Sequence, residues 1–323
     1  MIDPSSTKIA ACFDIGGSIA LTGFVDSGGN VLAEEKFRAS PGLEPGQLVK
    51  DLAVKIHALA VRSGIDWEQV CGVGYSTTGM MDITSGIIFS SPNQGNWHDV
   101  PIRKLLSNEF KLPAWIEMDA NAAALGEAWM GQGAGCEYFV HVIIGTGVSS
   151  GILVRGEILR GWRGTAGEFG HTVIDPDGPL CNCGGHGCLE SLTSGPAIAG
   201  RARRAVQAGQ PSRMTEPLSA QVVFDAARQG DELAQKIVAD TIGYLSIGLT
   251  NLIHLINPQI ITIGGGVGNG ASDLLVEPLR IATNCRVGNW VDMHGTHILP
   301  SKLGENAGLL GASRLVWKGI AQA

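Results

Sequence analysis

Apolar and polar positions along the first third of the chain predict strands first and then a helix. Residues 9–17 and 18–26 have the pattern of two apolar strands around a glycine turn. Apolar side chains recur at roughly helical spacing between residues 44 and 62, which predicts an amphipathic helix. A further strand is expected at 70–76, followed by a loop-rich stretch from 77 to 101.

The succession of apolar strand, glycine turn and apolar strand returns at residues 138–159. This echo of residues 9–32 predicts a duplicated α/β unit with two phosphate-facing hairpins across a cleft, although glycine hairpins are common enough for coincidence. A long helix is expected at 233–257, followed by an apolar strand and a glycine-rich loop at 264–270.

The chain is long enough for two domains, with 323 residues of which 44% are hydrophobic. We expect a smaller N-terminal α/β domain over residues 1–118, joined by a C-terminal helix within 305–323. A larger α/β domain is expected over residues 119–304.

The charge balance narrows the possible partners. The formal net charge is −7, which argues against nucleic acid, because nucleic-acid binding needs a basic face. Neither a signal-peptide pattern nor an apolar run of membrane-spanning length is visible. We therefore expect a cytoplasmic protein that binds neither nucleic acid nor membrane.

Four metal-ligating side chains fall within 18 positions: His171, Cys181, Cys183 and Cys188. One imidazole and three thiolates match a closed tetrahedral zinc site, which is structural because a catalytic zinc keeps one position open. A loop of scattered reduced cysteines is the alternative. A disulfide is less favoured, since Cys181 and Cys183 are too close in sequence to pair comfortably.

Glycine turns at 14–18, 145–151 and 264–267 offer backbone N–H groups without bulky side chains. In the first turn, Asp14 at a strand end could hold Mg²⁺ directly or through water. Thr146 adds a hydroxyl to the second turn, and the third follows an apolar strand, so its backbone could approach a nucleoside. An ordinary hairpin with Asp before Gly-Gly would look identical.

Asp119 stands between an apolar strand and an alanine-rich helix expected to begin near Ala120. An N-cap is one interpretation of this position, since a carboxylate there satisfies the first-turn amides. The other is a general base, which needs one carboxylate within reach of the hydroxyl proton that it accepts. Both interpretations stay open on the residues alone.

Glu168 and Glu190 bracket the cysteine-rich loop. Carboxylates on a rigid loop suit sugar hydroxyls, which present several donors in fixed geometry. The alternative is that both are surface charges, the usual situation of glutamate.

These motifs together resemble the ROK family of sugar kinases. DIGGS, MDANAAALGE, GTGVSSG, GEFGH, CNCGGHGCLE and GGGVG stand in the order of that family and span nearly the whole chain. The resemblance implies the two-domain actin-like ATPase fold shared with hexokinases, a duplicated ribonuclease H-like α/β fold, here with a zinc-bound loop. It also implies ATP-dependent phosphorylation of the 6-hydroxyl of a hexose or N-acetylhexosamine, with Mg²⁺, structural Zn²⁺ and a homodimer.

The resemblance further implies a role for each matching residue. Asp119 would be the catalytic base, sugar would contact Asn93, Asp119, Glu168, His171 and Glu190, and zinc would bind His171, Cys181, Cys183 and Cys188. ATP would contact Asp14, Gly16, Gly17, Ser18, Gly145, Thr146, Gly147, Gly265 and Gly266.

Two positions depart from the family pattern. Met118 replaces an asparagine that binds a sugar hydroxyl, and Ile19 follows Ser18 where the family continues with threonine and lysine. Motif similarity favours an N-acetylmannosamine kinase, with glucokinase as the alternative. A catalytically weak sugar sensor also stays open, whereas a repressor is disfavoured because the family's repressors carry a helix-turn-helix region before the first glycine turn.

Overall fold

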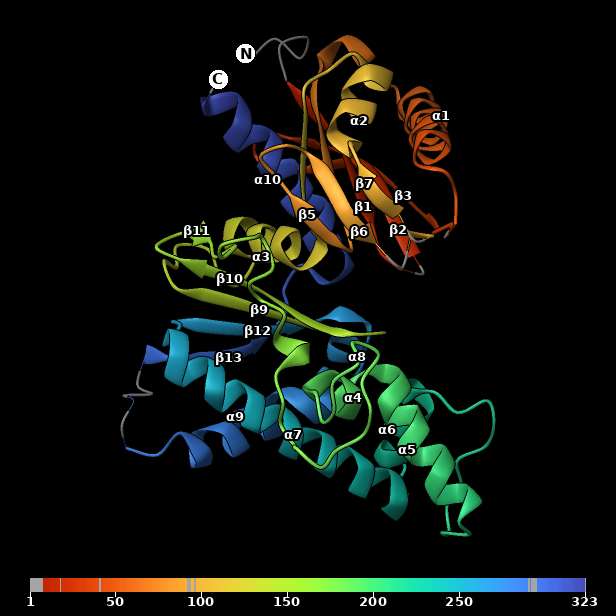
Figure 1. Cartoon of the computed structure of the whole chain (residues 1–323), viewed down its shortest axis with the longest axis vertical. Helices are drawn as coiled ribbons and strands as arrows, with labels where there is room; N and C mark the ends of the chain where they lie inside the picture. The colour runs from red at the N-terminus through yellow and green to blue at the C-terminus, as the bar shows by residue number, and fades with distance from the viewer. Residues whose placement is uncertain are drawn as a thin grey trace. The chain divides into compact units, whose positions relative to one another are not determined.

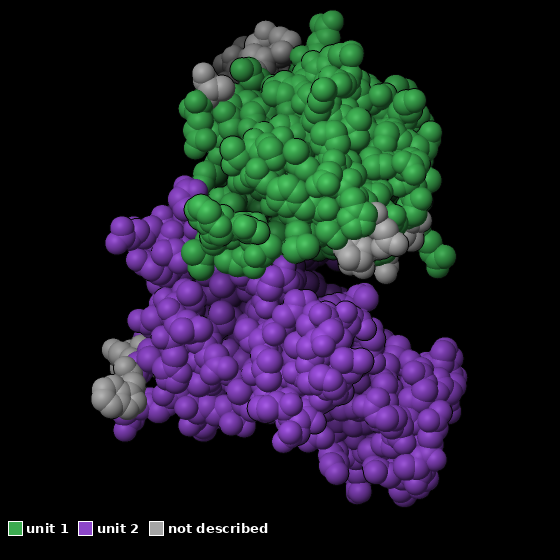
Figure 2. Space-filling view, in the orientation of Figure 1, with its two compact units in different colours: residues 1–134, 158–166, 306–323 green, residues 135–157, 167–305 purple. Residues whose placement is uncertain are grey.

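The computed structural model describes residues 8–17, 19–40, 42–91, 94–95, 97–289, 291 and 295–322. The chain forms two compact units, coloured separately in Figure 2. Unit 1 contains Met1–Ala134, Ile158–Ala166 and Asn306–Ala323, and unit 2 contains Gly135–Glu157 and Gly167–Glu305. Within the described ranges, no helix is long and apolar enough to cross a membrane.

A five-stranded mixed sheet forms the centre of unit 1 (Figure 1). Its order is β3 (Val31–Arg38), β2 (Ile19–Asp26), β1 (Ile9–Ile15), β4 (Val70–Thr77) and β8 (Ala114–Met118). The first three strands pair antiparallel, and β1, β4 and β8 run parallel. The parallel strands therefore end at the same edge of the sheet.

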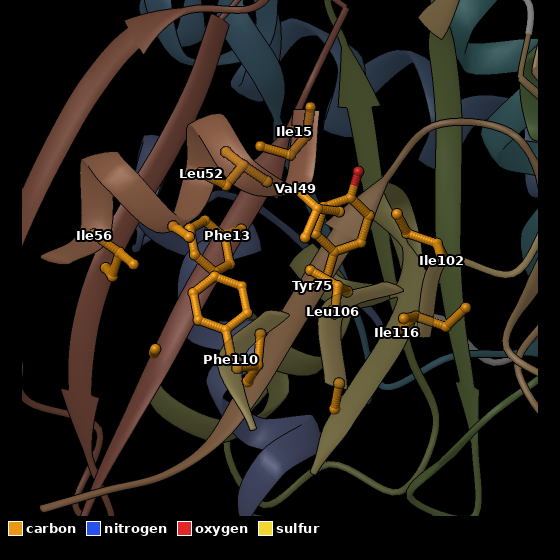
Figure 3. Close-up of a cluster of buried hydrophobic side chains, with 14 of the residues drawn as sticks. Phe13, Ile15, Val49, Leu52, Ile56, Tyr75, Ile102, Leu106, Phe110 and Ile116 are labelled. Atoms are coloured by element: carbon orange, nitrogen blue, oxygen red, sulfur yellow. The ribbon is translucent and has the colours of Figure 1, made fainter. Parts of the chain in front are cut away.

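Helices α1 (Pro45–Ser63) and α2 (Ile102–Phe110) pack on this sheet, and the 3₁₀ helix η2 (Trp67–Gln69) precedes β4. The expected helix at 44–62 is confirmed, and it ends where Gly64 adopts a φ of 67° that suits a left-handed C-cap. Figure 3 shows Phe13 and Tyr75 from the sheet gathered with Leu52 and Leu106 from the two helices. This apolar core fixes the strands whose ends carry Asp14 and Asp119.

The expected loop-rich stretch at 77–101 is wrong as a description of the described residues there. It contains a three-stranded antiparallel sheet of β5 (Met80–Asp82), β6 (Ile87–Ser91) and β7 (Trp97–Val100). Turn-forming residues interrupt these short strands too often for alternation to be visible in the sequence.

Unit 2 repeats the sheet plan of unit 1. Its order is β11 (Glu157–Ile158), β10 (Val148–Val154), β9 (Phe139–Ile144), β12 (Ile260–Gly264) and β13 (His297–Pro300). Again a hairpin leads into parallel strands, since β9 pairs antiparallel with β10 and parallel with β12. The prediction of a duplicated α/β fold is confirmed.

The helices of unit 2 are α4 (Leu189–Thr193), α5 (Gly195–Gln207), α6 (Ala220–Arg228), α7 (Glu232–Ile256), α8 (Gly265–Gly270) and α9 (Ser272–Val287), with the 3₁₀ helix η4 (Phe169–His171). The expected long helix corresponds to α7, which begins where the Asp231 carboxylate accepts the Ala234 N–H at 2.9 Å. The expected loop at 264–270 is wrong, because α8 forms there. Glycine disfavours helix, so packing on β9 and α9 supports this short element.

Two helices of unit 1 touch through their backbones: α3 (Asp119–Met130) and α10 (Ala307–Gln322), the latter preceded by η6 (Gly304–Asn306). A Cβ on Gly126 would lie 2.2 Å from the Ala307 carbonyl oxygen, and one on Gly311 would lie 1.7 Å from that of Ala122. This packing holds α3 in unit 1. The compact units therefore divide after Ala134 and not after residue 118, where the boundary was expected.

Replacing Gly311 with Ala is expected to lower the free energy of unfolding by about 3 kcal/mol, because the new methyl group would force α10 away from α3. Urea unfolding measures the loss. Gly243→Ala in α7 is the matched control, since its Cβ would meet nothing within 4 Å and should stabilise by about 0.5–1 kcal/mol. Equal effects of the two substitutions would contradict the packing.

Candidate active site

The parallel strands of unit 1 bring two carboxyl groups to one edge of the sheet. Asp14 near the end of β1 is in register with Ser76 of β4, whose hydroxyl donates a hydrogen bond to Asp14 Oδ1. Asp119 directly follows β8, the next strand. On the other side of Asp14, a Cβ on Gly308 of α10 would lie 2.1 Å from Oδ2, so only glycine leaves room for this carboxylate.

Both carboxyl groups titrate above the ordinary range of aspartate. Burial raises the pKa of Asp14 to about 7, the hydrogen bond from Ser76 lowers it, and the negative charge of Asp119 raises it further. Burial also raises the pKa of Asp119, against the opposing effect of the Ala120 N–H. The pair therefore forms an acidic, partly desolvated site that a cation would stabilise in its ionised form.

The N-cap interpretation of Asp119 does not describe its geometry. Met118 occupies the N-cap position of α3 and supplies no side-chain cap, while Asp119 is the first helical residue. Its Oδ1 accepts only the adjacent Ala120 N–H, at 2.8 Å, among the hydrogen bonds of the described residues. Met118 packs against the apolar core of unit 1. The carboxylate of Asp119 thus lies at the sheet edge in the first turn of α3, one position after the N-cap residue, and accepts a first-turn amide.

The first glycine turn lies at the same edge. The Gly16 N–H donates to the Ile19 carbonyl oxygen at 3.1 Å, which closes the turn between β1 and β2. Gly17 is exposed, and a Cβ there would meet nothing within 4 Å. The resemblance implied that Ser18 contacts ATP and that Asn93 contacts the sugar. Both residues lie outside the described residues.

In unit 2, the second glycine turn contacts Glu190, which was expected to bind the sugar. The Gly145 N–H donates to the Gly147 carbonyl at 2.9 Å across the turn between β9 and β10. Glu190, in the first turn of α4, accepts the Val148 N–H through Oε2 at 2.9 Å. A Cβ on Gly147 would lie 2.6 Å from that oxygen. The carboxylate of Glu190 therefore binds the backbone of the second glycine turn.

A cavity of about 450 Å³ opens beside this turn within unit 2. Of the glycine-turn residues, it brings together Gly145, Thr146 and Gly266, whereas Gly147 and Gly265 are not in its lining. Sequence reasoning missed most of the other lining residues, which are Gly195, Pro196, Ala199, Leu218, Ser219, Ala220, Gln221, Phe224, Val267, Gly270 and Ala271. They come from α5, α6, α8 and the segments beside them. Val267 and Gly270 belong to the glycine-rich stretch at 264–270 singled out in the sequence, whereas the residues of α5 and α6 do not.

The four predicted metal ligands lie together in unit 2. The ligand atoms of His171, Cys181, Cys183 and Cys188 are all within 4.8 Å of one another. His171 Nδ1 is 3.7 Å from Cys181 Sγ, and the sulfurs of Cys183 and Cys188 are also 3.7 Å apart. Gly187 permits the tight loop, because its φ is 64° and a Cβ would lie 1.5 Å from the Asp175 carbonyl oxygen.

The chemistry of this donor set fits zinc. Burial, together with the neighbouring sulfurs, raises the pKa of Cys188 to about 12, so a cation is needed for all three thiols to ionise together. Three sulfurs and one imidazole nitrogen complete a closed tetrahedral site with no position for substrate. The other ring nitrogen, His171 Nε2, lies 3.9 Å from a carboxylate oxygen of Glu168. His171 thus links the metal cluster to one of the residues assigned to sugar.

The unfolding free energy of the ligand-free protein is expected to fall as pH rises through about 7, because Asp14 binds its proton more tightly in the folded state. This contribution is fully present below the unfolded pKa of about 4 and totals roughly 2–4 kcal/mol. Thermal unfolding between pH 5 and 8 should show the slope in the wild type and lose it in Asp14→Asn. Parallel curves for the two proteins would mean that Asp14 ionises normally.

Comparison with known proteins places this arrangement in a family. The ROK family model matches residues 10–318. A glucokinase of Thermotoga maritima is 34% identical over 316 residues, covering 94% of this chain and 95% of that protein. A ROK family glucokinase from Streptomyces griseus, solved with glucose and AMPPNP, is 30% identical with a TM-score of 0.81, covering 96% of this chain and 98% of that one.

A structure from the other expected substrate group is also similar. A candidate N-acetylmannosamine kinase of Listeria monocytogenes is 26% identical with a TM-score of 0.80, and the match covers 97% of this chain and 99% of that chain. The identity is lower than for the two glucokinases, although the TM-score is close to that of the Streptomyces griseus glucokinase.

Proposed function

Because this chain belongs to the ROK family, we propose that it is an ATP-dependent glucokinase that phosphorylates the 6-hydroxyl of glucose. The observation that carries the proposal is the buried Asp119 carboxylate, which lies at the carboxyl edge of the unit 1 sheet and is not the N-cap residue of its helix. Such a group, with its pKa raised by burial, is suited to accept the proton of a sugar hydroxyl.

In this mechanism the residues of unit 2 bind the sugar and the nucleotide. The sugar hydroxyls form hydrogen bonds with Glu168, His171 and Glu190. The His-Cys₃ cluster holds the loop on which these residues lie. Gly145 and Thr146, which line the cavity, lie against phosphate oxygens, and the apolar Leu218 and Phe224 of the same lining suit a purine base. Phosphoryl transfer then depends chiefly on positioning and charge neutralisation.

Asp14 and Ser76 fit the Mg²⁺ that accompanies ATP, because carboxylate and hydroxyl oxygens are the ligands this ion prefers. When bound, Mg²⁺ neutralises charge on the phosphates. Asp14 would hold it directly or through water, while the exposed Gly17 in the turn beside it lets the phosphates approach the backbone closely. Asp119 accepts the proton as the sugar oxygen bonds to the terminal phosphorus of ATP, whose bond to the bridging oxygen breaks and releases ADP.

Glucose replaces N-acetylmannosamine as the favoured substrate. The motif similarity favoured the N-acetylated sugar, but the two glucokinases are more similar in sequence than the candidate N-acetylmannosamine kinase. Replacement of the family asparagine by Met118, which packs in the core, removes an amide from the sugar-contacting set. Without this amide, the site should recognise one sugar hydroxyl less strongly, which would change the preference among hexoses.

The experiment is ADP release with Mg-ATP against glucose, mannose, N-acetylglucosamine and N-acetylmannosamine. Turnover with glucose at the highest kcat/KM supports the proposal, and preference for an N-acetylated sugar would restore the earlier interpretation. Glucose binding by calorimetry without turnover of any sugar would instead indicate a sugar sensor.

A further inference from the structure

Glu117 is a fully hydrogen-bonded carboxylate two residues before Asp119. Its side chain is 1% exposed, and Oε2 accepts two hydrogen bonds from Arg160, from Nε at 3.0 Å and from Nη2 at 2.6 Å. Oε1 accepts the Met118 N–H and the Asn121 side-chain amide, each at 3.1 Å. With both oxygens engaged, Glu117 serves the protein itself and not a substrate.

Arg160 reaches Glu117 from a segment 43 residues further along the chain. Its carbonyl oxygen accepts the Ala166 N–H at 3.0 Å, which closes a loop and holds the backbone of Arg160 in place. Its side chain is 30% exposed, so the guanidinium reaches inward from the surface of unit 1 to a buried partner. Two N–H groups of a planar guanidinium on one carboxylate define its orientation more closely than a lysine could.

The position of these hydrogen bonds in the chain indicates a role beyond stabilising the fold. A buried ion pair is a poor stabiliser in general, because desolvation of the two charges offsets their attraction. Here the carboxylate bonds the residue immediately before Asp119 and the residue two positions after it. The last residue of β8 and the first turn of α3 are thereby tied to one side chain, and Asp119 lies between them.

We propose that the Glu117–Arg160 pair is a positioning device that orients the Asp119 carboxylate for proton transfer. The inference rests on the proposed kinase function, since it assigns the pair a part in that reaction. Neither side chain touches substrate in this role. Loss of the pair would leave the Asp119 carboxylate in place but less well oriented. The rate should then fall, because a small misplacement of a catalytic group slows the reaction strongly.

Arg160→Met tests the pair, because it removes the charge and keeps much of the side-chain volume. We expect kcat for glucose to fall roughly 10- to 100-fold, with KM and the calorimetric Kd for glucose within about threefold of wild type. Tm should fall by about 5 °C, since Glu117 is left buried without its cation. Arg62→Met is the matched control, because it breaks the exposed Arg62–Glu35 pair of the same unit.

The double variant Glu117→Gln/Arg160→Met separates positioning from stability. Removing the unpaired charge should restore most of the lost Tm while kcat stays low, because no guanidinium then fixes the side chain at position 117 that bonds Met118 and Asn121. Recovery of kcat together with Tm would overturn the proposal and reduce the pair to a structural contact. Unchanged kcat in Arg160→Met would overturn it as well.

Hydrogen exchange gives a readout that does not depend on turnover. Amides in residues 114–125 should exchange faster in Arg160→Met and in the double variant than in wild type or Arg62→Met, because the end of β8 and the start of α3 lose their common anchor. Unchanged exchange would overturn the positioning role. If the wild type turns over no sugar, the proposed function fails, and exchange still decides whether the pair orders the Asp119 segment.

Discussion

Replacing Asp119 with Asn is expected to lower kcat for glucose phosphorylation by roughly 10³-fold, because the amide cannot accept the proton of the attacking hydroxyl. The Kd for glucose should stay within about threefold of wild type, since the amide keeps the size of the carboxylate and can still hydrogen-bond the sugar. Steady-state kinetics and calorimetry on the same preparation measure the two quantities.

The matched control is Asp51→Asn, the same chemical change on helix α1 of the same unit, where the carboxylate accepts a hydrogen bond from Gln47. It should leave both kcat and Kd unchanged. Full activity of Asp119→Asn would show that another group accepts the proton. Because burial raises the pKa of Asp119, the acid limb of the wild-type kcat profile should lie above the ordinary aspartate range and disappear in the variant.

Loss of the metal from the His-Cys₃ cluster is the second large effect expected. Cys183 is the exposed thiol of the cluster, so Cys183→Ala removes a ligand with little loss of packing. Bound zinc should fall from about one ion per chain to less than about a tenth of that, and Tm should fall by about 10 °C, because zinc binding contributes directly to folding free energy. Elemental analysis and thermal unfolding measure these changes.

The same variant should bind glucose more weakly, by roughly tenfold, because the loop that carries Glu168 and His171 loses its anchor. Cys285→Ala is the control, since it removes an exposed cysteine outside the cluster. Zinc content and Tm that match the control would contradict a structural metal here. Loss of zinc with unchanged glucose affinity would separate the metal from the sugar-binding loop.

Local patterns were sufficient for the features that depend on neighbours in sequence. The spacing of His171, Cys181, Cys183 and Cys188 predicted a cluster that the structure brings within 4.8 Å. The two glycine hairpins predicted the duplicated sheet, because strand, turn and strand are contiguous. The long helix α7 also followed from apolar periodicity and its terminal signals. In each case the determining interactions run between residues close along the chain.

Contacts between distant segments could not be predicted from the sequence. The Ser76–Asp14 hydrogen bond joins residues 62 positions apart, and the Glu117–Arg160 pair joins residues 43 apart. Nothing in the local pattern of either segment specifies its partner. The same reason explains the missed strands at 77–101 and the missed lining of the cavity, where Leu218 and Phe224 had only the pattern of ordinary core residues.

The sequence by itself therefore determined the duplicated α/β fold and the cluster of metal-ligating side chains, because spacing along the chain encodes them. Only the tertiary structure decided their environment. It placed Met118, and not Asp119, at the N-cap of α3. Burial raises the pKa of Asp14 to about 7, and Glu190 supports the turn at Gly147. Burial and hydrogen bonding depend on what folding brings together, and these contacts set the chemistry of each group.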